Sequence, residues 1–323
     1  MKSIESEKKD SGYILAVSNE CPIPLPEKNH ILIKTSYSGV NRADIYQAEG
    51  NYSPPENVTD VLGLEISGEI IELGEDVKTA SKGSKVCALL QGGGYSEYVS
   101  VPEWRVLSVP EGVSLEQAAA IPETFLTAYL NIMEVAKLKP NESILIHGGA
   151  SGVGVAAIQI AKIFGAKVIV TAGSEEKCEL CKSLGADIAI NYKSQNFVSV
   201  VKAAGGVDVV LDMVGGDYIE KNMRVMKAKG RLISIAFING AKANVNFAPL
   251  LMKNLTMVGT TLRHKNEQEI YELIQSARSI LWPMFESGDL RVVIDSVFDV
   301  EDAGKAHDKM RDFSHIGKIL LKF

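Results

Sequence analysis

Cysteines, long apolar runs and clustered basic residues are all scarce in this sequence, and each shortage excludes a class of protein. Four cysteines in 323 residues are too few for a disulfide-rich secreted scaffold and predict a reducing compartment. No apolar run approaches the ~20 residues that a membrane-spanning helix needs. The first ten residues are charged and lack the apolar segment of a secretory signal. We therefore expect a cytoplasmic protein that does not enter a membrane.

An excess of positive charge is also missing. The net charge is −6, and the lysines and arginines are scattered along the chain. Such a protein repels the phosphates of nucleic acids and anionic lipid surfaces, so we expect neither as a partner. The length allows two domains with separate cores.

The first third of the chain is rich in strand signals. Proline and glycine clusters separate short apolar runs, which occur at 13–17, 30–34, 65–72 and 85–90. This pattern predicts a small, irregular, barrel-like β domain. Ser114 and Gln117 form the start of a helix with a capping box, and a second helix is expected from Glu123 to Val135.

The pattern then changes to a regular alternation of strands and helices. Strands are expected at 143–147, 167–171, 187–190, 207–211, 231–236 and 255–259. The intervening helices are expected to end at Gly165, Gly185, Gly205 and Gly230, since glycine is favoured just past a helix. Alternation of this length predicts an α/β fold with a doubly wound parallel sheet, the Rossmann fold.

Beyond residue 262 we expect a helix at 267–285, a strand at 292–298, a helix at 301–310 and a strand at 317–323. The sequence leaves open whether this tail extends the central sheet or returns to the first domain.

The segment 144–162 contains a strand, a glycine-rich turn and a helix in that order. Free N–H groups and the positive end of the helix dipole make such a helix N-terminus a site for a diphosphate. A glycine pattern alone is weak support, but four further strand–helix units follow it here. The candidate contacts are Gly149, Ser151, Gly152, Val153 and Gly154.

The end of the next strand indicates which dinucleotide binds. An acid there would bind the ribose 2′-hydroxyl of NAD, but none occurs before Glu175. Gly173, Ser174 and Lys177 are then available to a 2′-phosphate, and Tyr192 with Lys193 could close over it. We therefore favour NADPH as the cofactor. In the alternative, Ser174 only caps the next helix and Lys177 is a solvated charge.

Two further features have a structural interpretation. Cys178 and Cys181 lie within a predicted helix, and no second ligand pair or nearby histidine accompanies them. We interpret them as small buried residues rather than a metal or redox site. His147, at the end of a strand, is interpreted as a hydrogen-bonded interior histidine.

Several motifs resemble the zinc-free quinone oxidoreductase branch of the medium-chain dehydrogenase/reductase superfamily. Besides the glycine turn, they lie at 39–46, 50–52, 63–68, 94–98, 122–129, 191–192 and 315–318. The resemblance runs nearly end to end. It implies a GroES-like catalytic domain at 1–121, rejoined by 263–323, and a Rossmann NADP-binding domain at 122–262, with the active site in the interdomain cleft.

The zinc-dependent relatives use a cysteine near position 41 and a histidine near position 64 as catalytic ligands. This chain has Asn41 and Leu64 there, and Cys87 is the only cysteine in the region of their four-cysteine structural site. We therefore expect no zinc site. Without a Lewis acid, alcohol oxidation is disfavoured.

The resemblance also implies roles for individual residues. On the substrate side it places Asn41, Asp44, Tyr46 and Tyr52. At the carboxamide, nicotinamide and ribose of the cofactor it places Thr127, Tyr129, Phe237, Gly240, Thr261, Leu262 and Arg263, with Lys318 at a phosphate. Each has a structural alternative: a backbone-binding amide, a helix-start acid, packed tyrosines or ordinary surface charges.

These features predict an NADPH-dependent quinone reductase that transfers a hydride, or electrons singly, without zinc. One alternative is a reductase of α,β-unsaturated carbonyls, such as an alkenal, an enone or an enoyl thioester. Another is a catalytically idle NADPH-binding structural or sensor protein. Since Arg42 is the only basic residue in 41–60, a small neutral acceptor is favoured. The resemblance further implies a homodimer formed through the sheet edge at 255–259, or a tetramer.

Overall fold

The computed structural model describes residues 1–9 and 12–323, which form two compact units. The first unit comprises Met1–Leu126 and Arg263–Phe323, and the second comprises Thr127–Leu262. From the sequence, the first segment of this unit was expected to end at residue 121, a few residues before Leu126.

The second unit is built around a six-stranded parallel sheet with the strand order β10-β9-β8-β11-β12-β13. The strands are β8 (Ser143–His147), β9 (Lys167–Ala172), β10 (Ile188–Asn191), β11 (Val207–Asp212), β12 (Met226–Ser234) and β13 (Thr256–Gly259). All five residues of β8 are buried, as expected for a central strand covered on both faces. The predicted Rossmann class is confirmed.

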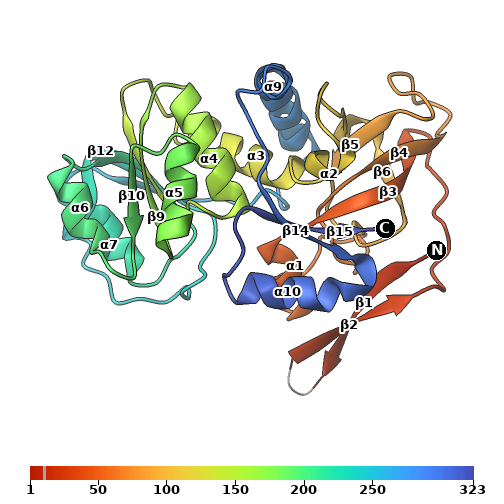
Figure 1. The fold of residues 1–323 in the computed structure, drawn as a ribbon, viewed down its shortest axis with the longest axis horizontal. Coiled ribbons are helices and arrows are strands. Elements are labelled where there is room, and N and C mark those ends of the chain that lie inside the picture. The colour runs from red at the N-terminus through yellow and green to blue at the C-terminus, as the bar shows by residue number, and fades with distance from the viewer. Residues whose placement is uncertain (10–11) are drawn as a thin grey trace. The chain divides into compact units, whose positions relative to one another are not determined.

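Helices cover both faces of this sheet (Figure 1). On one face lie α4 (Gly152–Ile163) and α5 (Glu175–Ser183), and on the other lie α6 (Phe197–Ala203) and α7 (Tyr218–Val225). The short α8 (Ala248–Met252) precedes the edge strand β13.

The strand order reverses between β8 and β11, which are hydrogen-bonded neighbours. Ligands of doubly wound sheets bind outside the carboxyl ends of the strands at this reversal. Gly148, which follows β8, has a φ of 67°, and a Cβ there would lie 2.8 Å from the sulfur of Met213, which follows β11. Glycine is therefore required where the two strand ends meet.

Gly230 was predicted to end a helix, and this prediction is wrong. Helix α7 ends at Val225, and β12 begins directly at Met226. Met226 pairs with Val207, and the register shifts before Arg231 pairs with Val209. The glycine thus belongs to an irregular stretch of a strand, where long-range pairing overrides the local cap signal.

The helix expected from Glu123 to Val135 changes its geometry partway. Helix α3 covers Pro122–Tyr129, and a π-helical turn, η2, continues it over Leu130–Val135. Inside this turn the buried Asn131 side chain donates to the carbonyl oxygen of Thr127 (2.8 Å) and accepts from the Thr260 hydroxyl (2.6 Å).

The first unit contains a seven-stranded sheet and an N-terminal hairpin. The hairpin pairs β1 (Ser3–Lys9) with β2 (Gly12–Ser18). The sheet consists of β3 (His30–Val40), β4 (Glu65–Leu73), β5 (Lys85–Leu89), β6 (Tyr98–Pro102), β7 (Val106–Ser108), β14 (Ile294–Asp299) and β15 (Lys318–Lys322). The short helices α1 (Arg42–Ala48) and α2 (Leu115–Ala118), together with α9 (Glu267–Glu286) and α10 (Ala303–Arg311), complete the unit.

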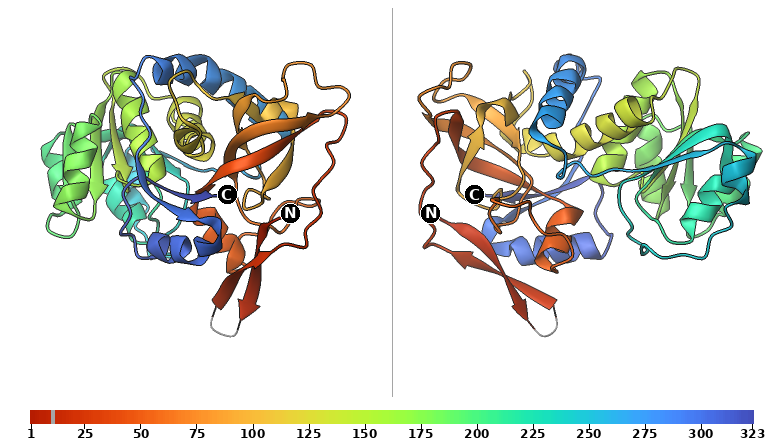
Figure 2. Two further views of the ribbon diagram at one scale, coloured as in Figure 1. Left: turned by 45° about the vertical axis from the view of Figure 1, so that its right-hand side comes forward. Right: turned by 180° about the vertical axis from the view of Figure 1, so that it is seen from behind.

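The position of the C-terminal tail, which the sequence left open, follows from the pairing of β15. This strand pairs antiparallel with β3 and parallel with β14, so the tail joins the first unit. Figure 2 shows the blue C-terminal strands beside the orange-red β3. Within the described ranges, no helix has the length and apolar character needed to cross a bilayer.

Candidate functional site

A buried ion pair between Lys318 and Glu65 lies at the centre of the first unit. The Lys318 side chain is 4% exposed and that of Glu65 is fully buried. The ammonium group also donates to Asn41 Oδ1 (2.5 Å), and Asn41 Nδ2 donates to Glu65 Oε1 (3.0 Å) and to the carbonyl oxygen of Gly39 (3.2 Å). The other Glu65 oxygen accepts the backbone N–H of Glu123 (2.9 Å). The amide of Asn41 is therefore held in a fixed orientation.

The order of the strands explains why these residues meet. Asn41 directly follows β3, Glu65 begins β4 and Lys318 begins β15, and β3 lies between the other two strands. Gly39 makes room for the carboxylate, because a Cβ there would lie 2.7 Å from Glu65 Cδ. The resemblance implied that Lys318 reaches a phosphate, whereas in the structure Glu65 and Asn41 already bind its ammonium group.

Asp44 lies in the first turn of α1 and is fully buried. Its carboxylate accepts the backbone N–H groups of Asn41 (2.7 Å) and Gly63 (3.2 Å) and the hydroxyl of Tyr95 (3.2 Å). Burial raises the pKa of Asp44 to about 6, although these hydrogen bonds and the charge of Lys318 oppose the shift. This geometry connects α1 to the loop before β4.

Hydrogen bonds continue from Asp44 toward the N-terminal hairpin. The Tyr95 hydroxyl is 3.0 Å from His307 Nε2, and His307 Nδ1 is 2.8 Å from the hydroxyl of Tyr13 on β2. Burial lowers the pKa of His307 to about 3, so the imidazole is neutral at physiological pH. The chain of hydrogen bonds fixes α10 and the hairpin against the Asp44 carboxylate.

A second cluster surrounds Tyr52. Its hydroxyl is 3.3 Å from His264 Nδ1, and the Arg263 guanidinium carbon is 5.4 Å from the centre of its ring. Burial raises the pKa of Tyr52 to about 12, so its hydroxyl keeps its proton. Tyr46 is partly exposed on α1, and its carbonyl oxygen accepts the N–H of Asn51 (2.8 Å). The structure therefore brings Tyr52, but not Tyr46, into a defined contact with another predicted site residue.

Glu123 and Glu65 are site residues that the sequence reasoning missed. Both lie in motifs that carried the resemblance, at 122–129 and 63–68, but neither was given a role. Glu123 is partly exposed near the start of α3. Burial, followed by the charge of Glu65, raises its pKa to about 8, so this carboxyl group carries a proton at neutral pH.

The glycine turn of the second unit has the shape of a phosphate cradle. Ser151 caps α4 by accepting the N–H of Gly154 (3.0 Å). A Cβ on Gly149 would lie 2.8 Å from Val170 Cβ, and one on Gly154 would lie 2.7 Å from the carbonyl carbon of Gly149. Bare backbone at these positions and the start of a 12-residue helix fit a diphosphate.

The corner predicted for a 2′-phosphate is compact. Ser174 accepts the N–H of Lys177 (3.3 Å), so it caps α5 as the structural alternative proposed. A Cβ on Gly173 would lie 2.8 Å from the hydroxyl of Tyr192, which is 44% exposed. No acidic side chain precedes Glu175 at this strand end. These residues fit a phosphorylated ribose.

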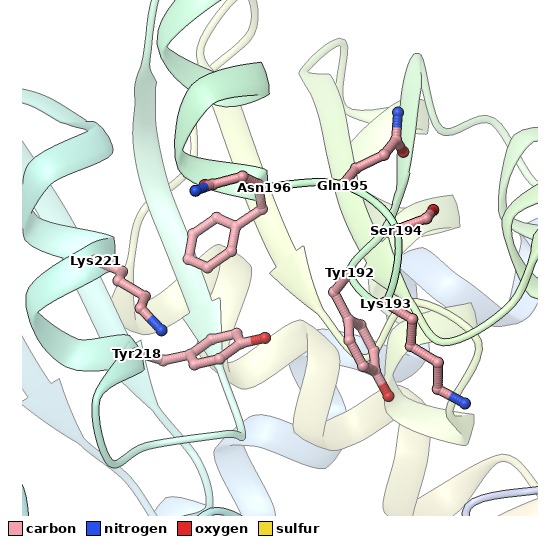
Figure 3. A pocket seen from close by; sticks show the side chains of 8 residues that line it. Tyr192, Lys193, Ser194, Gln195, Asn196, Tyr218 and Lys221 are labelled. Carbon is pink, nitrogen blue, oxygen red and sulfur yellow. The ribbon is translucent and has the colours of Figure 1, made fainter.

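A pocket of about 360 Å³ adjoins Tyr192 (Figure 3). The Tyr218 hydroxyl is directed toward the Tyr192 side chain, and Lys193 and Lys221 add positive charge. The sequence analysis identified Tyr192 and Lys193 here but not Tyr218 and Lys221, which lie in the first turn of α7 and come near only through the folding of the sheet. The lining residues are Tyr192, Lys193, Ser194, Gln195, Asn196, Phe197, Tyr218 and Lys221.

The remaining predicted cofactor residues differ in their exposure. Tyr129 and Leu262 are buried, Thr127 is partly exposed, and Phe237 is 48% exposed in the loop after β12. Thr261 is exposed, and Gly240, in the same loop as Phe237, has a φ of 91°.

The burial expected for Cys178, Cys181 and His147 is observed. Cys178 and Cys181 are buried on α5 and are free thiols. His147 is fully buried between Thr171 Oγ1 (3.0 Å) and Asn222 Oδ1 (2.8 Å). In the described part of the chain, no group of three or more His, Cys, Asp or Glu side chains is arranged to hold a metal ion.

Two family models match the chain. One describes the alcohol dehydrogenase GroES-like domain and matches residues 27–111. The other describes zinc-binding dehydrogenases and matches residues 152–279.

Individual relatives match over nearly the whole chain. A Bos taurus protein named quinone oxidoreductase-like protein 2 is 32% identical over 311 residues, covering 95% of this chain and 88% of the relative. The quinone oxidoreductase of Sus scrofa is 30% identical over 328 residues, covering 99% of this chain and 97% of the relative. The solved structure of Escherichia coli quinone oxidoreductase complexed with NADPH is 29% identical to this chain and superposes on it with a TM-score of 0.89. The match covers 100% of both chains.

The buried ion pair gives a first prediction. Replacing Lys318 with Met leaves the Glu65 carboxylate buried without its partner, which we expect to lower the free energy of unfolding by about 3–5 kcal/mol. The double variant K318M/E65Q should recover much of this loss. Urea unfolding measures both, and Lys182→Met, in the exposed pair with Glu179, serves as the control. A loss no larger than the control's would show that the pair contributes little.

The raised pKa of Glu123 predicts a pH dependence of stability. The folded protein binds this proton more tightly than the unfolded chain, so stability falls as the pH rises from about 4.5 to about 8. Glu123→Gln cannot titrate, and we expect its Tm at pH 9 to exceed that of the wild type by at least about 2 °C. Thermal unfolding at pH 5 and pH 9 tests this, with the exposed Glu286→Gln as control. Equal pH slopes in wild type and E123Q would contradict it.

Proposed function

This chain belongs to the quinone oxidoreductase branch of the medium-chain dehydrogenase/reductase superfamily, and we propose that it is an NADPH-dependent quinone reductase. The observation that carries the proposal is the full-length similarity to the E. coli quinone oxidoreductase, which was solved with NADPH. The acid-free end of β9 supports the same cofactor, because a 2′-phosphate is repelled by a carboxylate at that position.

The second unit supplies the residues that would hold NADPH. In our proposal the N–H groups of Gly152, Val153 and neighbouring turn residues bind the diphosphate, and Ser174, Lys177 and Tyr192 bind the 2′-phosphate. Around the nicotinamide and its ribose the proposal retains Thr127, Tyr129, Phe237, Gly240, Thr261 and Leu262. NADPH, when bound, supplies a hydride.

The first unit supplies the acceptor side of the proposed site. Asn41, with its amide fixed by Glu65 and Lys318, and the tyrosines Tyr46 and Tyr52 would orient the quinone. The buried contacts of Asp44 support a positioning role for it, because its oxygens hold the backbone of Asn41 and Gly63. Hydrogen-bond donors then stabilise the oxygen on which negative charge develops.

A homodimer in the cytoplasm forms part of this proposal. Strand β13 is an edge of the parallel sheet, and apolar side chains around it are exposed. They are Phe247 (55%), Leu251 (78%), Met252 (80%) and Met257 (36%). An apolar edge of this kind is covered in solution when a second copy pairs with it. The four cysteines are free thiols, which is typical of a reducing compartment.

Turnover of two acceptors tests the proposed function. Metal-free protein is mixed with NADPH and either 1,2-naphthoquinone or trans-2-hexenal, and the oxidation of NADPH is recorded. We expect rapid oxidation with the quinone and little with the enal. Oxidation with the enal alone would reassign the protein to α,β-unsaturated carbonyls. Binding of NADPH without turnover of either acceptor would favour the idle-binder alternative.

A variant in α5 tests separately whether the protein prefers NADP⁺ to NAD⁺. We expect Lys177→Ala to raise the Kd for NADP⁺ about tenfold or more and to leave the Kd for NAD⁺ unchanged, since only the former carries the 2′-phosphate. Isothermal titration calorimetry measures both constants. Lys182→Ala, an exposed lysine of the same helix, is the matched control. Equal effects of K177A on the two dinucleotides would contradict the assignment.

A further inference from the structure

The guanidinium group of Arg263 is buried with donors to spare. Arg263 is 6% exposed, and its Nε donates to the carbonyl oxygen of Gln91 (2.7 Å). Its terminal nitrogens Nη1 and Nη2 have no hydrogen-bond partner within the described ranges. Burying charged donors without an acceptor is costly, so an arrangement of this kind points to an acceptor that arrives with a ligand.

The surroundings of Arg263 indicate what that ligand offers. The ring of Tyr52 lies near the guanidinium group, with 5.4 Å between the guanidinium carbon and the ring centre. Glu123 and Asp44 interact with its charge, yet neither carboxyl group forms an ion pair with it in the described structure. The positive charge is therefore available to an oxygen atom with negative charge, and burial of the guanidinium group strengthens the interaction.

Glu123 belongs to the same group of residues. Its charge interacts with those of Arg263 and Tyr52, and also with Glu65, Lys318 and Asp44. Burial, followed by the charge of Glu65, raises the pKa of Glu123 to about 8, so Glu123 holds no negative charge beside Arg263 at neutral pH. All of these residues lie in the first unit.

We propose that Arg263 binds the carbonyl oxygen of the acceptor and stabilises the oxyanion formed during reduction. The proposal rests on the proposed function and adds one residue to the acceptor site. It also changes the expectation for Arg263, which the resemblance placed beside the cofactor.

The proposed step balances in atoms and electrons. The hydride brings two electrons and forms one bond to the quinone, and a π pair moves onto the carbonyl oxygen. Arg263 donates hydrogen bonds to that oxygen through Nη1 and Nη2. A proton from water joins the oxyanion, and the buffer neutralises the hydroxide that remains, so quinone, hydride and proton give the two-electron-reduced product.

The affinity for an oxyanion is measured without turnover. The full chain with NADP⁺ is titrated with 4-nitrophenol, whose anion absorbs visible light, at a pH where the free phenol is mostly neutral. We expect the wild type to bind the dye as its anion. Arg263→Gln should weaken binding of the anion about tenfold or more, and Arg263→Lys should retain part of it. Arg278→Gln, an exposed arginine of the same unit, is the control.

Three results would overturn the proposal. The first is a wild type that binds only the neutral dye, and the second is an R263Q variant that binds the anion as well as the wild type does. The third is an R263Q variant with weakened NADP⁺ binding and unchanged dye binding, which would assign Arg263 to the cofactor. Failure of the wild type to reduce any quinone would refute the proposed function, while the dye titration would still decide the role of Arg263.

Discussion

The first unit depends on one interaction, the buried ion pair between Glu65 and Lys318. Removing two charges from water is costly, and only close contact with further hydrogen bonds offsets it. Asn41 and the backbone N–H of Glu123 supply those bonds. The pair therefore sets the positions of three strand ends and of the start of α3. The pair also affects the pKa of Glu123. Burial is the first cause of that raised pKa, and the charge of Glu65 is the second.

Two kinds of buried polar group coexist in this unit. Asp44, Tyr95 and His307 bind one another and the backbone, and their burial fixes the geometry around them. Arg263 differs, since two of its nitrogens have no partner in the described structure. Buried polar groups with hydrogen-bond partners inside the protein stabilise a fold. A buried cation without such partners can still form hydrogen bonds with a ligand. The contrast separates groups that the fold itself satisfies from the one cation that we propose contacts a ligand.

The sequence predicts well where the signal is local. The strand 143–147, the glycine turn and the capping box at Ser114 depend on neighbouring residues, and the structure has all three. Gly230 was misassigned because the pairing of Met226 with Val207 decides the start of β12. Glu65, Glu123 and the free donors of Arg263 could not be found from spacing alone, since their roles arise from residues far away in the chain. The resemblance identified their motifs but not their contacts.

The separation of Lys318 from its partners has a consequence for the order of folding. Asn41 and Lys318 are 277 residues apart, and the whole second unit lies between them in the chain. Contacts of such long range form late, because the loop must close before they are gained. During synthesis from the N-terminus, the parallel sheet is complete before β15 exists. The Glu65 carboxylate therefore lacks its cation until the last strand joins β3, so the ion pair at the centre of the first unit forms at the end of folding.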